Sequence, residues 1–357
     1  MQALLRPVDL GALHLRNRII MAPMTRNRAI AGDVPSELAA RYYGARAAAG
    51  LIVTEGTQPS VHGKGYCRTP GMHSAAQVDA WRTVTEAVHR GGGCIVLQLM
   101  HCGRIGSHHN KAPGARTLAP SALRAAGKIF TDDVGLVEFD TPEELSLPEV
   151  QGVIAEYAAA ARQARLAGFD GVELHAASGY LPMQFLSTGT NLRRDAYGGG
   201  LNGRLRFVVE CLEALAGVFG SGRVGLRICP GNPFNDMHDE RPLETYAALL
   251  RSLERLELAY LHVIRSPDPA IDAFALAREC FRGARIFNDG FDFASGSEAI
   301  TSGGAAAVSY ARAFIANPDL VERYVNGWPL AAFDRKTLYT AGAEGYTSYP
   351  THTAAAG

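Results

Sequence analysis

The sequence predicts a single (β/α)8 barrel, an α/β fold in which eight parallel strands alternate with helices. Three observations lead to this fold: the length of 357 residues, the alternation of short β-rich runs with longer helical patterns, and a count of about eight such runs. A chain of this length suits one barrel with insertions better than two ordinary domains. We therefore expect one domain over 1–357, with an N-terminal cap and an insertion at about 103–147 after the third strand.

The expected strands are short runs of apolar and β-branched residues. Runs of about five residues suit the buried positions of a parallel barrel. In chain order the eight runs are 19–24, 51–54, 95–99, 171–174, 224–228, 259–263, 284–287 and 306–310.

Helix signals separate these runs. Residues 146–149 and 74–77 have the spacing of capping boxes, in which a serine and a residue three positions later satisfy free backbone N–H groups. Apolar residues recur with helical spacing after the first box, and Gly168 is expected to end that helix. A second amphipathic pattern over 243–253 leads into the sixth strand. The order of strand and helix is that of a barrel.

The segment 103–147 interrupts this rhythm with Gly, Pro, His and Asp. An insertion after the third strand overhangs the C-terminal face of a barrel, where such enzymes bind their substrates. We expect it to form part of a lid or a small subdomain. The alternative is a disordered surface excursion.

Composition excludes several classes of protein. The 35 basic residues balance 35 acidic residues, so the net charge gives no general attraction to nucleic acid or to an anionic membrane. No run approaches the roughly 20 apolar residues of a membrane span, and the N-terminus lacks a secretory pattern. Six cysteines without a C-x-x-C pair, and histidines without ligand spacing, predict no metal site. We expect a cytoplasmic monomer or homodimer.

Reactive groups of a barrel are expected at the C-terminal ends of its strands. Gly290 and the loop after the eighth strand lie where barrels bind phosphate through backbone N–H groups, and Arg312 can add an ionic contact. These features favour a phosphate-bearing planar cofactor, and a flavin is one possibility. The strand-end residues are Pro23, Met24, Thr25, Thr57, Gln98, His101, His175, Ser178, Tyr180, Arg227, Asn288, Asp289, Gly290, Ala311 and Arg312.

Specific motifs follow one another along almost the whole chain. They are APMTR at 22–26, YY-x-x-RA-x-AGLIVTEGT at 42–57, KGY at 64–66, QL-x-H-x-GR at 98–104, AGFDGVELH-x-x-x-GYL-x-x-QFLS at 167–187, N-x-R-x-D-x-YGG at 191–199, IANPDLV at 315–321 and GAEGYT at 342–347. In these motifs the chain resembles the Old Yellow Enzyme family of FMN-dependent NAD(P)H oxidoreductases.

The resemblance implies a role for each matching residue. Tyr180 corresponds to the proton donor, His175 and Ser178 to the pair that binds the substrate's activating oxygen, and Tyr339 to a tyrosine that borders the substrate. The positions that correspond to FMN contacts are Thr25 at flavin O4, Gln98 and Arg227 at the pyrimidine edge, Pro23, Met24 and Thr57 along the ring, and Asn288, Asp289, Gly290, Ala311 and Arg312 at the phosphate.

The reaction implied is reduction of the activated C=C bond of an electrophilic alkene, an α,β-unsaturated carbonyl or nitro compound. Hydride passes from FMN to the β-carbon and a proton from Tyr180 to the α-carbon, with NADPH or NADH as reductant. Negative charge develops on the carbonyl oxygen and needs preorganised donors. No G-x-G-x-x-G unit separates NADH from NADPH.

Several positions depart from the pattern of the family. Ser178 stands where histidine or asparagine is usual, and Met100 where tryptophan is common. Asp289 and Ala311 stand in glycine-like places, whereas Thr25 groups the chain with the branch that has no cysteine there. These departures leave two alternatives open: the same flavin barrel used for double-bond isomerisation or a specialised biosynthetic reduction, and a catalytically silent flavin-binding barrel.

Overall fold

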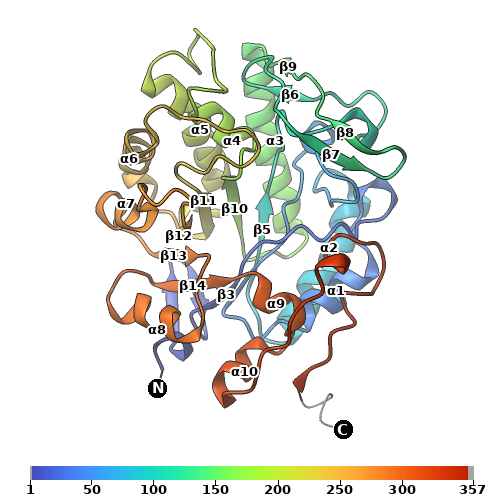
Figure 1. Cartoon of the computed structure of the whole chain (residues 1–357), viewed down its shortest axis with the longest axis vertical. Helices are drawn as coiled ribbons and strands as arrows, with labels where there is room; N and C mark the ends of the chain where they lie inside the picture. Colours follow the sequence, from blue (N-terminus) through green and yellow to red (C-terminus); the bar gives the residue numbers. More distant parts are fainter. Residues whose placement is uncertain (1, 353–357) are drawn as a thin grey trace.

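Eight parallel strands close into a barrel in the computed structural model, which describes residues 2–352 (Figure 1). The last strand pairs with the first, and this pairing closes the ring. The predicted fold is therefore confirmed. The strands are β3 (Ile19–Met21), β4 (Leu51–Val53), β5 (Ile95–Leu99), β10 (Gly171–Ala176), β11 (Val224–Ile228), β12 (Tyr260–Ile264), β13 (Arg285–Asn288) and β14 (Ala307–Tyr310).

The first strand differs most from its expected range, because the residues 22–24 continue as a loop rather than as strand. Pro23 cannot donate to a strand ladder, which is consistent with this early end. The expected domain range also includes residues 1 and 353–357, which lie outside the described residues.

Helices surround the barrel (Figure 1). The two predicted capping boxes are present: Ser74 Oγ accepts from the backbone N–H of Gln77 at 3.3 Å, and the backbone N–H of Ser146 donates to Glu149 Oε2 at 2.8 Å. Gly168, with a φ of +86°, follows the second of these helices as expected. The helices are α1 (Glu37–Gly44), α2 (Ala75–Arg90), α3 (Leu147–Leu166), α4 (Leu181–Leu186), α5 (Leu201–Phe219), α6 (Pro242–Ser252), α7 (Ala273–Cys280), α8 (Phe293–Thr301), α9 (Arg312–Ala316) and α10 (Leu320–Asn326).

An N-terminal hairpin closes one end of the barrel. Its strands are β1 (Val8–Leu10) and β2 (Leu13–Leu15), and their buried leucines pack against Ile20 and Val96 of the barrel strands. This hairpin is the expected N-terminal cap. It leaves the opposite end of the barrel, which carries the C-terminal ends of the strands, for the functional site.

The segment 103–147 is folded rather than disordered. It contains a short parallel pair, β6 (Leu118–Ala119) with β9 (Glu143–Glu144), and an antiparallel hairpin, β7 (Lys128–Thr131) with β8 (Gly135–Glu138). Ile129 is buried in one hydrophobic cluster with Met100 and Tyr180, so the hairpin shares a core with residues that follow the barrel strands.

The C-terminal segment crosses the same end of the barrel. Arg28 donates to the carbonyl groups of Thr337 at 2.7 Å and Glu344 at 2.9 Å, and Arg26 donates to Gly345 at 2.6 Å. Both arginines are buried, so these bonds fix the segment against the loop after β3. Within residues 2–352, none of the helices is long and apolar enough to cross a membrane.

Candidate active site

A cavity of about 910 Å³ lies at the C-terminal ends of the barrel strands. Its walls come from barrel strand ends, from the hairpin strand β7 and from the C-terminal segment. This volume suits a small-molecule site with a bound cofactor. The predicted site residues that line it are Pro23, Met24, Thr25, Gln98, His175, Ser178, Tyr180, Arg227, Ala311, Arg312 and Tyr339.

Four predicted residues do not line the cavity. Thr57 is fully buried behind its wall, where its hydroxyl donates to the carbonyl of Glu55 at 3.0 Å, and Gly56 reaches the cavity instead. Asn288 is buried beneath the site, and the exposed residues Asp289 and Gly290 follow it beside Arg312.

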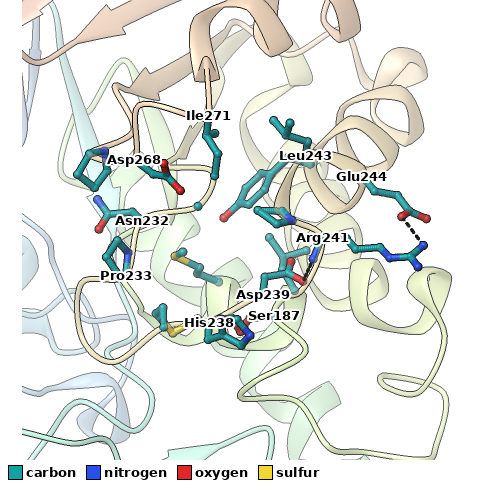
Figure 2. A pocket seen from close by; sticks show the side chains of 17 residues that line it. Ser187, Asn232, Pro233, His238, Asp239, Arg241, Leu243, Glu244, Asp268 and Ile271 are labelled. Carbon is teal, nitrogen blue, oxygen red and sulfur yellow. Dashed lines mark hydrogen bonds and ion pairs between the residues drawn. The ribbon is translucent and has the colours of Figure 1, made fainter.

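A second cavity, of about 810 Å³, lies beside α4 and the start of α6 (Figure 2). Met183 and Leu186 of α4 contribute to its lining, together with Asp239, Asp268 and Ile271. No predicted site residue lines it. The functional residues expected from the sequence therefore converge on the first cavity.

His175, at the end of β10, is a neutral hydrogen-bond donor. Its Nδ1 accepts from the backbone N–H of Ala177 at 3.3 Å, which leaves the ring proton on Nε2. Burial, together with the charge of Arg227, lowers the pKa of His175 to about 3. The imidazole is therefore uncharged at neutral pH and can donate a hydrogen bond from Nε2.

Tyr180 precedes the first residue of α4 and places its phenol next to His175. The two rings meet edge to face, with 4.9 Å between their centroids. The Tyr180 hydroxyl donates to the Tyr66 hydroxyl at 3.2 Å. Burial raises the pKa of Tyr180 well above its ordinary value, so the phenol keeps its proton until a strong base forms beside it.

Tyr66 was not predicted as a site residue, although it belongs to the KGY motif. It lines the cavity, and burial raises its pKa to about 12. The motif was the available signal, but its contact with Tyr180 joins residues 114 positions apart in the chain.

Ser178 adopts a left-handed backbone conformation, with a φ of +57°. Its backbone N–H contacts Cys229 Sγ at 3.0 Å, and its carbonyl accepts from Asn235 Nδ2 at 2.8 Å. Among residues with a side chain, asparagine tolerates this region better than serine. The short hydroxyl is the part of Ser178 that remains to meet a ligand.

A buried polar network lies beneath the cavity. Gln98 Nε2 donates to Glu173 Oε1 at 2.8 Å, and Glu173 Oε2 lies 2.8 Å from His262 Nδ1. His262 Nε2 lies 2.8 Å from Ser309 Oγ and 2.5 Å from Arg227 Nη1. With the His262 proton on Nδ1, the imidazole donates to Glu173, and the single lone pair of Nε2 faces the Arg227 guanidinium and the Ser309 hydroxyl.

The network holds one negative and one positive charge. Burial would raise the pKa of Glu173, but His262 and Arg227 outweigh it and the pKa lies below its usual value. Burial, with Arg227, lowers the pKa of His262 to about 4. The Glu173 carboxylate is thus ionised, and it orients Gln98 directly and Arg227 through a neutral imidazole.

Glu173 and His262 were missed by the sequence analysis as functional residues. The available signal is that each stands between two apolar neighbours in a buried strand, β10 or β12, where a polar side chain is unusual.

The cavity lining suits a planar cofactor that carries a phosphate. Gln98 and Arg227 contribute polar side chains to the lining, and the hydroxyl of Thr25 has no hydrogen-bond partner within residues 2–352. A side chain at Gly56 would displace the thioether of Met100, so glycine leaves room for Met100 where the backbone borders the cavity. Within the described part of the chain, no cluster of His, Cys, Asp and Glu could hold a metal ion.

Comparison with known proteins places this site in a family. Residues 3–331 match the NADH:flavin oxidoreductase / NADH oxidase family. A probable flavin mononucleotide-dependent alkene reductase of Leishmania infantum is 40% identical over 353 residues, which cover 97% of each chain.

Two solved structures share the whole fold. Morphinone reductase in complex with tetrahydroNAD has a TM-score of 0.94 and 42% identity, covering 98% of both chains. The Old Yellow Enzyme of Trypanosoma cruzi has a TM-score of 0.94 and 38% identity, covering 98% of this chain and 99% of its own. The chain therefore belongs to the NADH:flavin oxidoreductase / NADH oxidase family, and within it to the Old Yellow Enzymes.

Proposed function

We propose that this chain reduces the activated C=C bond of an α,β-unsaturated carbonyl or nitro compound, with bound FMN and with NADPH or NADH as reductant. The observation that carries the proposal is the edge-to-face contact of His175 and Tyr180, with a neutral donor and a protonated phenol at one end of the cavity. The names of its relatives, an alkene reductase and a morphinone reductase, agree with this chemistry.

In this proposal, the cavity would hold the flavin. Thr25, Gln98 and Arg227 would bind the edge of the ring, while Glu173 keeps Gln98 and Arg227 oriented. When bound, FMN supplies the hydride chemistry, accepting hydride from NAD(P)H and delivering it to the β-carbon of the alkene. The ring would be bordered by Pro23, Met24 and Gly56, and the phosphate by Ala311 and Arg312, with the turn 288–290 beside Arg312.

The substrate's activating oxygen binds to His175 Nε2, with the Ser178 hydroxyl as a weaker second partner. Negative charge grows on this oxygen as the β-carbon is reduced, and a donor fixed in a dry cavity stabilises that charge more than water does. Because His175 is already neutral, it donates the hydrogen bond without losing a proton. Tyr339 borders the entrance, where 60% of its surface is exposed.

Tyr180 protonates the α-carbon. The O–H bond of the phenol breaks, a C–H bond forms at the α-carbon, and the charge moves to the phenolate oxygen. The Tyr66 hydroxyl, 3.2 Å away, can rotate to donate to that phenolate. Solvent then returns a proton to Tyr180, which completes the cycle.

The hairpin of β7 and β8 acts as a wall of the substrate site in this proposal. Lys128, Ile129 and Phe130 of β7 line the cavity, and Ile129 packs in one cluster with Tyr180. The segment 103–147 therefore contributes part of a lid, as expected from its place after the third barrel strand.

Turnover of 2-cyclohexenone tests the proposed activity. Purified protein loaded with FMN is mixed with NADPH and the enone, and NADPH consumption is compared with formation of cyclohexanone. The proposal predicts equal amounts of both. Full FMN occupancy with negligible cyclohexanone would contradict it, and an isomerised enone formed without NADPH would support the alternative of isomerisation.

A further inference from the structure

Arg265, in the loop after β12, is an arginine with a fixed position at the protein surface. Its guanidinium lies over two aromatic rings, 4.8 Å from the centroid of Phe274 and 5.1 Å from that of Phe291. Phe274 is itself stacked on Phe287 of β13 at 4.1 Å. These contacts hold an exposed side chain in place, because arginine binds aromatic faces through its delocalised charge.

Arg265 contacts the turn that follows β13. Its Nε donates to the carbonyl of Asp289 at 3.2 Å, and a Cβ built on Gly290 would lie 3.4 Å from the same nitrogen. Both turn residues are left-handed, with φ values of +76° and +77°. This conformation is unfavourable for aspartate, so an outside donor to its carbonyl helps to maintain the turn.

The carboxylate of Asp289 opposes binding of a phosphate at this turn, so a second positive charge near it would favour the phosphate. Asp289 Oδ1 lies 3.4 Å from Arg312 Nη2, so a carboxylate competes for the arginine that we assign to the FMN phosphate. Asp289 and Arg312 together carry no net charge. Arg265 adds a second positive charge beside Asp289, which favours binding of a phosphate dianion.

We infer that Arg265 is a positioning residue for the cofactor phosphate. It holds the Asp289 carbonyl in the left-handed turn and offsets the Asp289 carboxylate, which leaves Arg312 available to the phosphate. The inference rests on the proposed position of the phosphate at residues 288–290 and Arg312. It explains how the chain accepts an aspartate in a place where a negative charge opposes an anionic ligand.

Binding of FMN and riboflavin to the apoprotein tests this role, because riboflavin has the same ring without the phosphate. Flavin fluorescence is titrated with wild type, Arg265→Gln, Asp289→Gly and the double variant. Arg282→Gln is the control, since Arg282 is an exposed arginine that pairs with Glu254 at 3.0 Å.

We expect Arg265→Gln to raise the Kd for FMN about tenfold, as for loss of a partly screened charge, and to leave the Kd for riboflavin unchanged. Raising the salt concentration should reduce the difference between this variant and wild type. Asp289→Gly removes both the opposing charge and the strained residue, so the double variant should bind FMN at least as tightly as wild type. The control should bind both flavins normally.

Four results would overturn the inference. An equal loss for FMN and riboflavin would indicate a general structural role, and an unchanged FMN affinity would exclude any role. A double variant as weak as Arg265→Gln would refute the offset of Asp289. Wild type that binds riboflavin as tightly as FMN would refute the phosphate site itself, and with it the corresponding part of the proposed function.

Discussion

The two residues that we propose for binding the substrate's activating oxygen, His175 and Ser178, differ in how well they are placed to donate a hydrogen bond to it. His175 is held by the Ala177 N–H, is neutral and has Nε2 available. Ser178 has a left-handed backbone and a short hydroxyl, and its backbone groups are engaged by Cys229 and Asn235. One donor is therefore preorganised for charge stabilisation and the other is not.

Ser178→Asn should improve the site. Asparagine adopts a φ near +57° more readily than serine, and its amide reaches further into the cavity. A full second hydrogen bond to a developing charge is worth about 1.4 kcal/mol, or about tenfold in kcat/KM for 2-cyclohexenone. Steady-state kinetics measures the effect, with Ser178→Ala as the control that should change activity by less than about threefold. An asparagine variant no faster than wild type would contradict the second-donor role.

At the scale of elements, short segments from distant parts of the chain build the cavity. The helix α4 presents Tyr180 at its start, and Phe185 within it stacks on Phe207 of α5 at 4.1 Å. The hairpin strand β7 alternates between buried and exposed side chains, so Ile129 packs inward and Phe130 remains 52% exposed while lining the cavity. An exposed aromatic side chain at a cavity entrance is suited to contact a ligand.

Phe130→Ala should weaken binding of a bulky enone without destabilising the protein. The side chain is half exposed, so we expect the melting temperature to change by no more than about 2 °C. Loss of an apolar wall should raise KM severalfold for a bicyclic enone and little for 2-cyclohexenone. Leu136→Ala is the matched control, because Leu136 lies on the partner strand, is 67% exposed and does not line the cavity. Identical KM values for the two variants would argue against a lid role.

The barrel as a whole is connected beneath the cavity by the network of Gln98, Glu173, His262 and Arg227. These residues come from β5, β10, β12 and β11, so one carboxylate joins four strands. Removing the one negative charge of this buried network leaves the Arg227 charge uncompensated in a poorly solvated interior.

Glu173→Gln should therefore lower the free energy of unfolding by about 3 kcal/mol at neutral pH, measured by urea denaturation. The folded-state pKa of Glu173 lies below its unfolded value, so its contribution is present above about pH 4 and is lost as the pH falls further. Glu254→Gln, in an exposed pair with Arg282, should change stability by less than about 1 kcal/mol. A loss for Glu173→Gln no greater than that of the control would contradict the network's role.

The barrel could be predicted well because buried parallel strands are short apolar runs. A capping box, such as the one at Ser74, marks the start of its helix within neighbouring residues of the sequence. Most of the site residues predicted from the sequence line the cavity, since strand ends meet at one face. The roles of Glu173, His262 and Tyr66 were missed because each depends on a partner far away in the chain, 89 positions for Glu173 and His262. Local patterns carry no information about such contacts.

The proton transfer from Tyr180 is the central claim, and stopped-flow absorbance of the Tyr180→Phe variant tests it most directly. NADPH should reduce the bound flavin at the wild-type rate, because this half-reaction needs no proton from the phenol. Reoxidation of the reduced enzyme by 2-cyclohexenone should be slower by about 100-fold or more, the contribution expected of a positioned general acid. Reoxidation at the wild-type rate would contradict the assignment of Tyr180 as the proton donor.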